Sequence, residues 1–243
     1  YWAVVVIMLS GGLAGMIWCL VQVLRPPSPR ADLVAGVRRI LLADKGAPLS
    51  EPLAEILKAA PTFAVRTQPH PLLDKPAPGF VLKGVDGKEL RLAEALAKGP
   101  VVLVFYYGYH CDHCVSQLFA LNEDLKYFRE LGAEVIAASA DPPELTREKY
   151  DEFRAKGGAF AFPVLSDPGN RVAESYGAFV PAAKGRQEDL QHGTFVIDRL
   201  GFVRWANLGS APFVNVRALL GELARLEGRL PAIPRVQGGT DSG

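Results

Sequence analysis

Residues 101–125 read VVLVFYYGYHCDHCVSQLFALNEDL, and this stretch decides the fold. It begins with a continuous apolar run of the kind that forms a strand buried on both faces. Cys111 and Cys114 follow directly, and behind them apolar residues such as Leu118 and Leu121 recur at the spacing of one helix face. The stretch therefore predicts a strand that turns into a helix through a Cys-x-x-Cys motif.

The motif has three chemical readings: a redox pair, a peroxide-reducing nucleophile with its resolving cysteine, or half of a metal site. A cysteine at a helix N-terminus meets free N–H groups and the positive end of the helix dipole, which together favour a thiolate. This placement lowers a thiol pKa from about 8.5 to roughly 3.5–7.5. We therefore expect Cys111 to be the nucleophile and Cys114, one turn later, to close the disulfide. His113 favours the reduced form and the charge of Asp112 opposes it.

Outside the motif, strand and helix patterns alternate. Short strands flank an Asp86-Gly87 turn in residues 79–92, and a second buried strand is expected in residues 133–139. The remaining predicted elements are helices in 92–99, 142–158 and 213–228, a strand in 162–167, a turn and short helix in 168–178, and a hairpin in 194–208. This order predicts an α/β fold with a central sheet of mixed direction and helices on both sides.

The first residues differ in composition from the rest of the chain. Residues 1–24 carry no charged side chain and are long enough to cross a bilayer as a helix, so we expect a transmembrane anchor rather than a cleaved signal peptide. Residues 25–69 come next as a Pro-containing helical linker, 70–230 as the catalytic domain, and 231–243 as a disordered tail. The arginines after the anchor favour a cytoplasmic side for the linker and the catalytic domain.

Charge and cysteine content exclude some classes of protein. With 243 residues and a formal net charge of +1, the chain has no basic face for nucleic acid. Its third cysteine, Cys19, lies in the expected anchor, so Cys111 and Cys114 are the cysteines of the soluble part. A secreted disulfide scaffold would need more, so the pair is expected to be chemical rather than structural.

Five segments in order resemble the thioredoxin-fold redoxins of the alkyl hydroperoxide reductase and thiol-specific antioxidant superfamily, together with membrane-tethered thioredoxins. They are KPAPGFVLKGVDGKELRL, VVLVFYYGYHCDHC, LGAEVIAASAD, FPVLSDPGNRVAESYG and HGTFVIDRLGFVRW. The resemblance implies a thioredoxin-like fold, redox or antioxidant activity at the cysteines, and an extracytoplasmic, single-pass membrane protein.

The departures from this family pattern bear on function. Peroxiredoxins place Pro, Thr and the peroxidatic Cys where this chain has Tyr107, Cys111 and Cys114, and His192 stands where they have an arginine. Membrane-tethered thioredoxins have a cis-proline before the same strand, and this chain has none there. A peroxidase needs groups that polarise the peroxide, so these departures weaken the peroxidase reading.

The sequence therefore predicts a membrane-anchored thiol-disulfide oxidoreductase with Cys111, Cys114, His113 and His192 at its site and no cofactor or resident metal. Its partners would be protein thiols, disulfides or hydroperoxides and an electron-donating thiol partner. A thiol peroxidase with Cys114 as nucleophile and Cys111 as resolver is the first alternative.

The second alternative is a non-enzymatic protein, either a copper chaperone or a docking subunit of a membrane complex. His110, Cys111, His113 and Cys114 offer soft ligands, and His192 could approach from the late strand. The thioredoxin-fold copper chaperones, which this arrangement resembles, have one more residue between their cysteines.

Overall fold

The computed structural model describes residues 48–155 and 160–230. The predicted anchor, the linker up to residue 47 and the predicted tail lie outside these described residues. Within the described ranges, no helix is both long and apolar enough to span a bilayer.

Seven strands form the central sheet in the order β2-β1-β5-β4-β3-β8-β9, and a separate two-stranded sheet pairs β6 with β7. β3 is an inner strand that runs parallel to β4 and antiparallel to β8. The strands are β1 (Val81–Gly84), β2 (Glu89–Arg91), β3 (Val101–Phe105), β4 (Glu134–Ser139), β5 (Val164–Ser166), β6 (Phe179–Val180), β7 (Asp189–Leu190), β8 (His192–Ile197) and β9 (Val203–Gly209). The predicted mixed sheet is confirmed.

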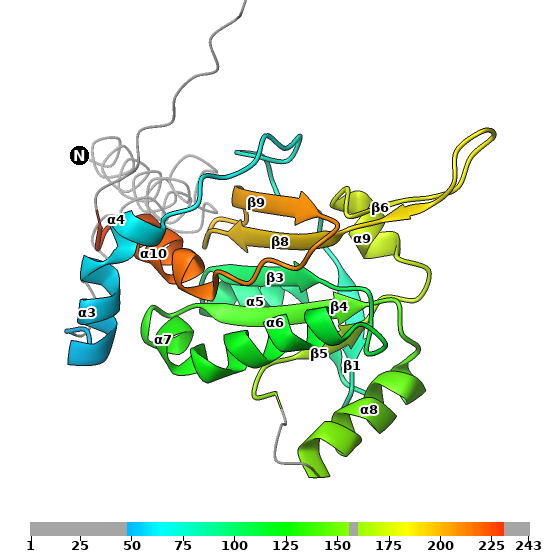
Figure 1. Ribbon diagram of the computed structural model, residues 1–243, viewed down its shortest axis with the longest axis horizontal. Coiled ribbons are helices and arrows are strands. Elements are labelled where there is room, and N and C mark those ends of the chain that lie inside the picture. The colour runs from blue at the N-terminus through cyan, green and yellow to red at the C-terminus, as the bar shows by residue number, and fades with distance from the viewer. Residues whose placement is uncertain (1–47, 156–159, 231–243) are drawn as a thin grey trace, which may run out of the picture. The chain divides into compact units, whose positions relative to one another are not determined.

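Helices cover both faces of the sheet (Figure 1). One face packs against α3, α6, α7 and α10, and the other against α5 and α9. The described helices are α3 (Glu51–Lys58), α4 (Ala60–Phe63), α5 (Leu92–Lys98), α6 (Asp112–Glu123), α7 (Leu125–Glu130), α8 (Pro143–Ala155), α9 (Arg171–Ser175) and α10 (Val216–Leu226).

Every residue of β3 is buried, as the apolar run predicts. Val102 and Val104 face the layer that contains α6, whereas Leu103 and Phe105 face the layer that contains α5. Side chains alternate between the two faces of a strand, so a strand covered on both sides needs apolar residues at each position. This burial fixes the end of β3, from which the cysteine motif begins.

Two local features differ from the predicted elements. The helix expected after the motif is two helices, α6 and α7, because Asp124 leaves the helical conformation at φ −92° and ψ 5°. A hairpin of β6 and β7, which the sequence did not predict, extends away from the sheet just before His192 (Figure 1). Its strands have two residues each, too few to give an alternating pattern.

Residues 48–69, assigned above to the linker, contribute to the core. Leu53 in α3 is 0% exposed and joins the cluster that contains α6 and α10. Farther on, Thr67 and Gln68 lie along β9: the N–H of Ala206 donates to Thr67 Oγ1 over 2.9 Å, and that of Leu208 to Gln68 Oε1 over 2.8 Å. This segment therefore supplies hydrogen-bond partners to β9, at the end of the strand order.

Candidate functional site

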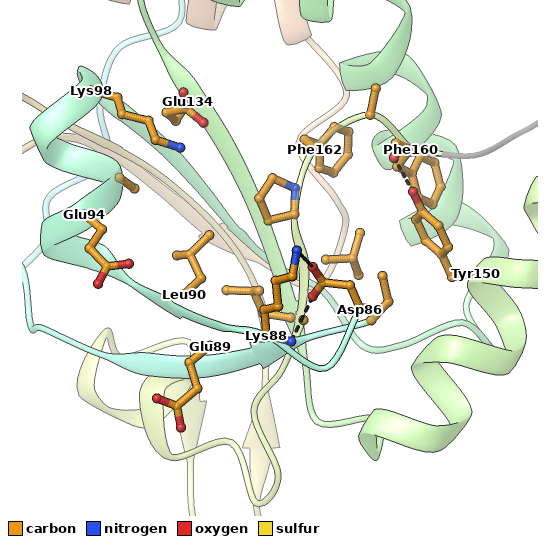
Figure 2. A pocket seen from close by; sticks show the side chains of 17 residues that line it. Asp86, Lys88, Glu89, Leu90, Glu94, Lys98, Glu134, Tyr150, Phe160 and Phe162 are labelled. Carbon is orange, nitrogen blue, oxygen red and sulfur yellow. Dashed lines mark hydrogen bonds and ion pairs between the residues drawn. The ribbon is translucent and has the colours of Figure 1, made fainter.

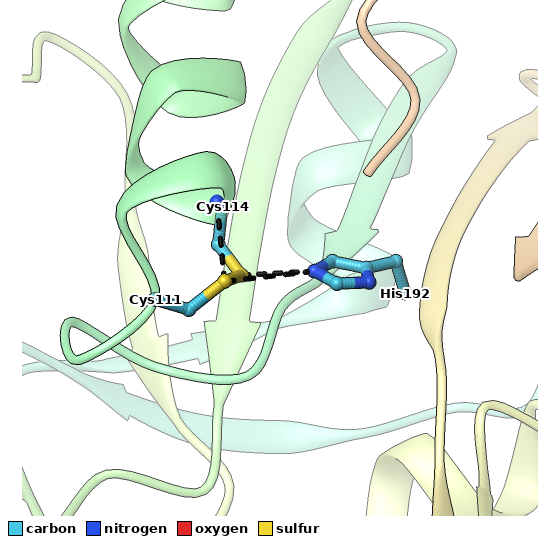
Figure 3. A group of neighbouring side chains, drawn as sticks. All are labelled: Cys111, Cys114 and His192. Atoms are coloured by element: carbon cyan, nitrogen blue, oxygen red, sulfur yellow. Dashed lines mark hydrogen bonds between the residues drawn. A yellow bond between two sulfur atoms is a disulfide. The ribbon is translucent and has the colours of Figure 1, made fainter. Parts of the chain in front are cut away.

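Cys111 and Cys114 lie where β3 gives way to α6, and their sulfurs form a disulfide (Figure 3). Cys111 is the N-cap residue of α6, and its Sγ accepts a hydrogen bond from the Cys114 N–H over 3.3 Å. The first cysteine therefore occupies the helix N-terminus, in the geometry that stabilises a thiolate.

The two sulfurs differ in access. Cys114 is 0% exposed and belongs to the core, whereas Cys111 is only half-buried. Cys111 is therefore the more accessible residue of the pair for an external disulfide. The pair has one outer sulfur and one inner sulfur.

His192, the first residue of β8, faces the same disulfide (Figure 3). The neighbouring pair of Phe105 with Gly193 aligns the start of β8 with the end of β3, which brings residue 192 beside the motif. Its Nε2 lies 2.9 Å from Cys114 Sγ and 4.0 Å from Cys111 Sγ. The imidazole therefore contacts the inner sulfur most closely.

The residue His192 is 4% exposed, and burial lowers the pKa of its imidazole. The backbones of Gly209 and Ser210 offset part of this effect, although no described group reaches Nδ1 with hydrogen-bond geometry. Burial thus disfavours the charged imidazole, and Nε2 faces the sulfur of Cys114, from which it would take a proton in the reduced state.

Tyr107 stacks on the His192 ring from the loop after β3. The ring centroids are 3.9 Å apart and the planes differ by 29°. Burial raises the pKa of Tyr107, and the negative charge of Asp189 raises it further. The phenol is therefore neutral near pH 7 and presents a π face to the imidazole.

Asp141, which follows the end of β4, holds the loop between Tyr107 and Cys111 in place. The N–H of Tyr109 donates to Asp141 Oδ2 over 3.0 Å. Gly108 has φ +120°, and a Cβ at this position would lie 2.7 Å from Asp141 Oδ1. Only glycine allows this approach of backbone to carboxylate.

Other buried polar groups surround the motif. Gln117, one turn after Cys114, donates from Nε2 to Thr194 Oγ1 over 3.1 Å. Burial raises the pKa of Tyr106 well above its ordinary value and that of Tyr109 to about 12. Sequence reasoning missed Gln117, although a polar residue on the face shared with Cys114 and Leu118 was a usable signal.

The structure brings together three of the four predicted site residues. Sulfur and nitrogen atoms of Cys111, Cys114 and His192 lie within 4.8 Å of one another, whereas His113 and His110 are exposed and lie outside this group. Only the reduced pair would offer both sulfurs to a thiophilic ion. The two further histidines of the predicted copper site do not take part.

A separate surface hollow shares no residue with this site (Figure 2). It lies between the β1–β2 hairpin, α5 and the segment before β5, and Lys88, Glu94 and Lys98 are among its lining residues. No cysteine or histidine lines it, and Lys88 pairs with Asp86 at 3.7 Å. This hollow therefore offers no thiol or imidazole among its described lining residues.

Curated proteins of two kinds are similar to this chain. Peroxiredoxin Q of Populus jackii is 34% identical over 132 residues, which are 52% of this chain and 55% of that protein. The thiol-disulfide oxidoreductase ResA of Geobacillus thermodenitrificans is 30% identical over 129 residues, or 53% of this chain and 64% of that protein. The chain thus spans between about half and two thirds of the length of these relatives.

Solved structures share the fold. The peroxidoxin BcpB of Mycobacterium tuberculosis superimposes with a TM-score of 0.54 at 27% identity, covering 65% of this chain and 98% of that one. The sequence profile of the AhpC/TSA family matches residues 73–206, more than half of the chain, and this range includes both cysteines and His192. The chain therefore belongs to the AhpC/TSA family.

Proposed function

We propose that this protein is a thiol-disulfide oxidoreductase that works through Cys111 and Cys114. The observation that carries the proposal is the difference in access, since Cys114 is 0% exposed and Cys111 is half-buried at the N-terminus of α6. A thiolate that attacks another molecule must be reachable, and the thiolate that resolves the product need not be.

In the first step the Cys111 thiolate attacks a substrate disulfide. A bond forms between Cys111 Sγ and one substrate sulfur, the substrate S–S bond breaks, and the other substrate sulfur leaves as a thiolate that takes a proton from water. The helix N-terminus stabilises the attacking thiolate.

In the second step Cys114 resolves the mixed disulfide. Its thiol gives its proton to His192 Nε2, which lies 2.9 Å from Cys114 Sγ in the disulfide form. The new thiolate attacks Cys111 Sγ, the mixed disulfide breaks, and the second substrate sulfur leaves and takes up the proton. The protein dithiol has become a disulfide, and one substrate disulfide has become two thiols.

The substrate and cellular site belong to the same proposal. Protein disulfides are the substrates, and an external thiol partner returns the pair to the dithiol. An anchor in residues 1–24 holds the domain at the extracytoplasmic face, which the family resemblance favours over the cytoplasmic side indicated by the arginines after the anchor. The similarity to the oxidoreductase ResA supports the disulfide chemistry. The uncharged first 24 residues support the anchor.

A thiol peroxidase is the second candidate. It is favoured by the similarity to peroxiredoxin Q and by the contact between His192 and Cys114, the cysteine at the peroxidatic position of the family pattern. The full burial of Cys114 opposes it. A copper chaperone would have to bind its ion through the reduced cysteine pair and His192, because His110 and His113 lie outside this group.

The test compares two substrates on the full chain. With dithiothreitol as reductant, we expect insulin disulfides to be reduced at a rate that depends on Cys111, and hydrogen peroxide to be consumed slowly. Fast peroxide consumption that survives Cys111→Ser and ends with Cys114→Ser, without insulin reduction by the parent, would replace this proposal with the peroxidase.

A further inference from the structure

We propose that Tyr107 is a positioning residue that holds the His192 imidazole against Cys114 Sγ and stabilises the positive charge this ring carries during resolution. The inference rests on the proposed function, because it assigns a role within its second step. Tyr107 acts in this role through its contact with His192.

The geometry around the imidazole supports this role. The His192 ring touches the disulfide at one end and Tyr107 on one face, with ring centroids 3.9 Å apart at 29°. The backbones of Gly209 and Ser210 also act on the ring, although neither meets strict hydrogen-bond geometry at Nδ1 in the described structure. The stacked Tyr107 ring is the side-chain contact on the face of the imidazole and restrains the plane in which Nε2 points to the inner sulfur.

The electrostatics of the stacked rings support it as well. When His192 takes the proton of Cys114 it becomes an imidazolium in a buried place, which burial disfavours. The face of an aromatic ring carries negative charge and attracts a cation lying on it. Tyr107 therefore favours the charged ring that forms in this step more than the neutral ring from which it forms.

Several elements contribute groups that face His192. Cys111 and Cys114 face it from the start of α6, Tyr107 from the loop after β3, and the backbones of Gly209 and Ser210 from the end of β9. On the hairpin side, Asp189 acts on Tyr107. The Tyr107 ring supplies a π face beside the imidazole, which attracts the positive charge that the imidazole carries during resolution.

The experiment separates the two steps in one reaction. The reduced full chain is mixed rapidly with the aryl disulfide dithiobis(nitrobenzoate), which releases one coloured thiolate when Cys111 attacks and a second when Cys114 resolves. Tyr107→Phe keeps the ring and its π face, whereas Tyr107→Leu keeps apolar bulk without a π face. Both phases are followed between pH 5.5 and 8.

We expect Tyr107→Phe to leave both phases within about twofold of the parent. Tyr107→Leu should slow the second phase by a factor of between about 2 and 30, the range expected for losing a cation–π contact, and should change the pH profile of that phase only. Equal second phases in the Phe and Leu variants, with unchanged pH profiles, would overturn the proposal. Equal slowing of both phases would also overturn it, because it indicates general structural damage.

Thermal unfolding shows whether Tyr107→Leu is folded. If it is not, Tyr107→Met takes its place. The proposed function fails separately: a parent that shows both phases with the aryl disulfide but leaves insulin intact contradicts protein-disulfide reduction without touching the role of Tyr107.

Discussion

The region around the cysteine motif and the segment of residues 65–68 along β9 differ in whether their polar groups have hydrogen-bond partners. Within the described residues, four buried side-chain atoms have no partner at hydrogen-bond geometry: Tyr106 OH, Tyr109 OH, Gln117 Oε1 and His192 Nδ1. All four belong to the cysteine motif, its flanks or the strand opposite.

Along β9, in contrast, polar groups are matched. Trp205 Nε1 donates to the Val65 carbonyl over 2.9 Å, Gln68 N–H donates to the Ala206 carbonyl over 2.9 Å, and Thr67 accepts from the N–H of Ala206. Unpaired buried polar groups cost stability and are concentrated at functional sites. The exposed edge of a sheet, in contrast, has to be covered to prevent edge-to-edge association. The comparison therefore places the polar atoms without a geometric partner around the cysteine motif, and the paired ones along β9.

The largest expected effect tests residues 48–69, the segment that contributes to the core. Leu53→Ala should lower the free energy of unfolding by about 2–5 kcal/mol, because it opens a cavity in the core. Leu200→Ala is the matched control, since Leu200 is 58% exposed and should change stability by less than about 0.5 kcal/mol. Urea unfolding of the two variants gives the difference, and equal stabilities would show that residues 48–63 are not part of the cooperative unit.

The next effect tests the loop that leads into the cysteine motif. Gly108→Ala places a Cβ against the Asp141 carboxylate at φ +120°, whereas Gly169→Ala meets no atom within 4 Å at φ +77°. We expect Gly108→Ala to lose about 2 kcal/mol more than Gly169→Ala, since it adds a steric conflict to backbone strain. Equal losses would mean that the loop yields and that Asp141 does not fix it.

A smaller loss of stability is expected when Thr67, beside the edge strand β9, is replaced. Thr67→Val removes the oxygen that accepts from the Ala206 N–H and leaves this donor unpaired, at a cost of about 1–2 kcal/mol. Thr62→Val, at an exposed position, should stay within about 0.5 kcal/mol of the parent. Equilibrium unfolding measures both, and no difference between them would mean that another group or water replaces the threonine oxygen.

The smallest expected effect is the pH dependence of stability. Burial lowers the pKa of His192 and of His70, whose Nδ1 accepts from the Leu72 N–H over 3.2 Å. The unfolded chain then binds protons more readily, so this contribution is present above about pH 6.5 and is lost as the pH falls. His70→Gln or His192→Gln should flatten the fall in stability between pH 7.5 and 5.5, and an unchanged slope in both variants would contradict this account.

The sequence predicted the fold from periodicity, because buried strands such as Val101–Phe105 and Glu134–Ser139 carry uninterrupted apolar patterns. It could not predict which partners meet across the sheet. Thr67 and Gln68 read as linker residues because their role depends on β9, far away in the chain. Asp141 comes directly after the buried strand Glu134–Ser139, yet its carboxylate accepts from the Tyr109 N–H in the loop after β3.

For the site, the spacing of Cys111 and Cys114 carried the chemistry, and the alignment of the late strand suggested His192. The stack of Tyr107 on His192 depends on the register of β3 and β8, which no local pattern encodes. His113 was selected because it lies between the cysteines, but on the first turn of α6 its side chain faces solvent.

The central claim is that Cys111, and not Cys114, attacks an external disulfide. The most direct test measures which cysteine forms the mixed disulfide. Reduced Cys114→Ser and Cys111→Ser variants of the full chain are incubated with glutathione disulfide at pH 7, and the glutathione adducts are followed by mass spectrometry. We expect rapid addition to Cys111 in the Cys114→Ser variant and addition at least about tenfold slower to buried Cys114 in the other. Faster addition to Cys114 would make Cys114 the nucleophile and contradict the proposed mechanism.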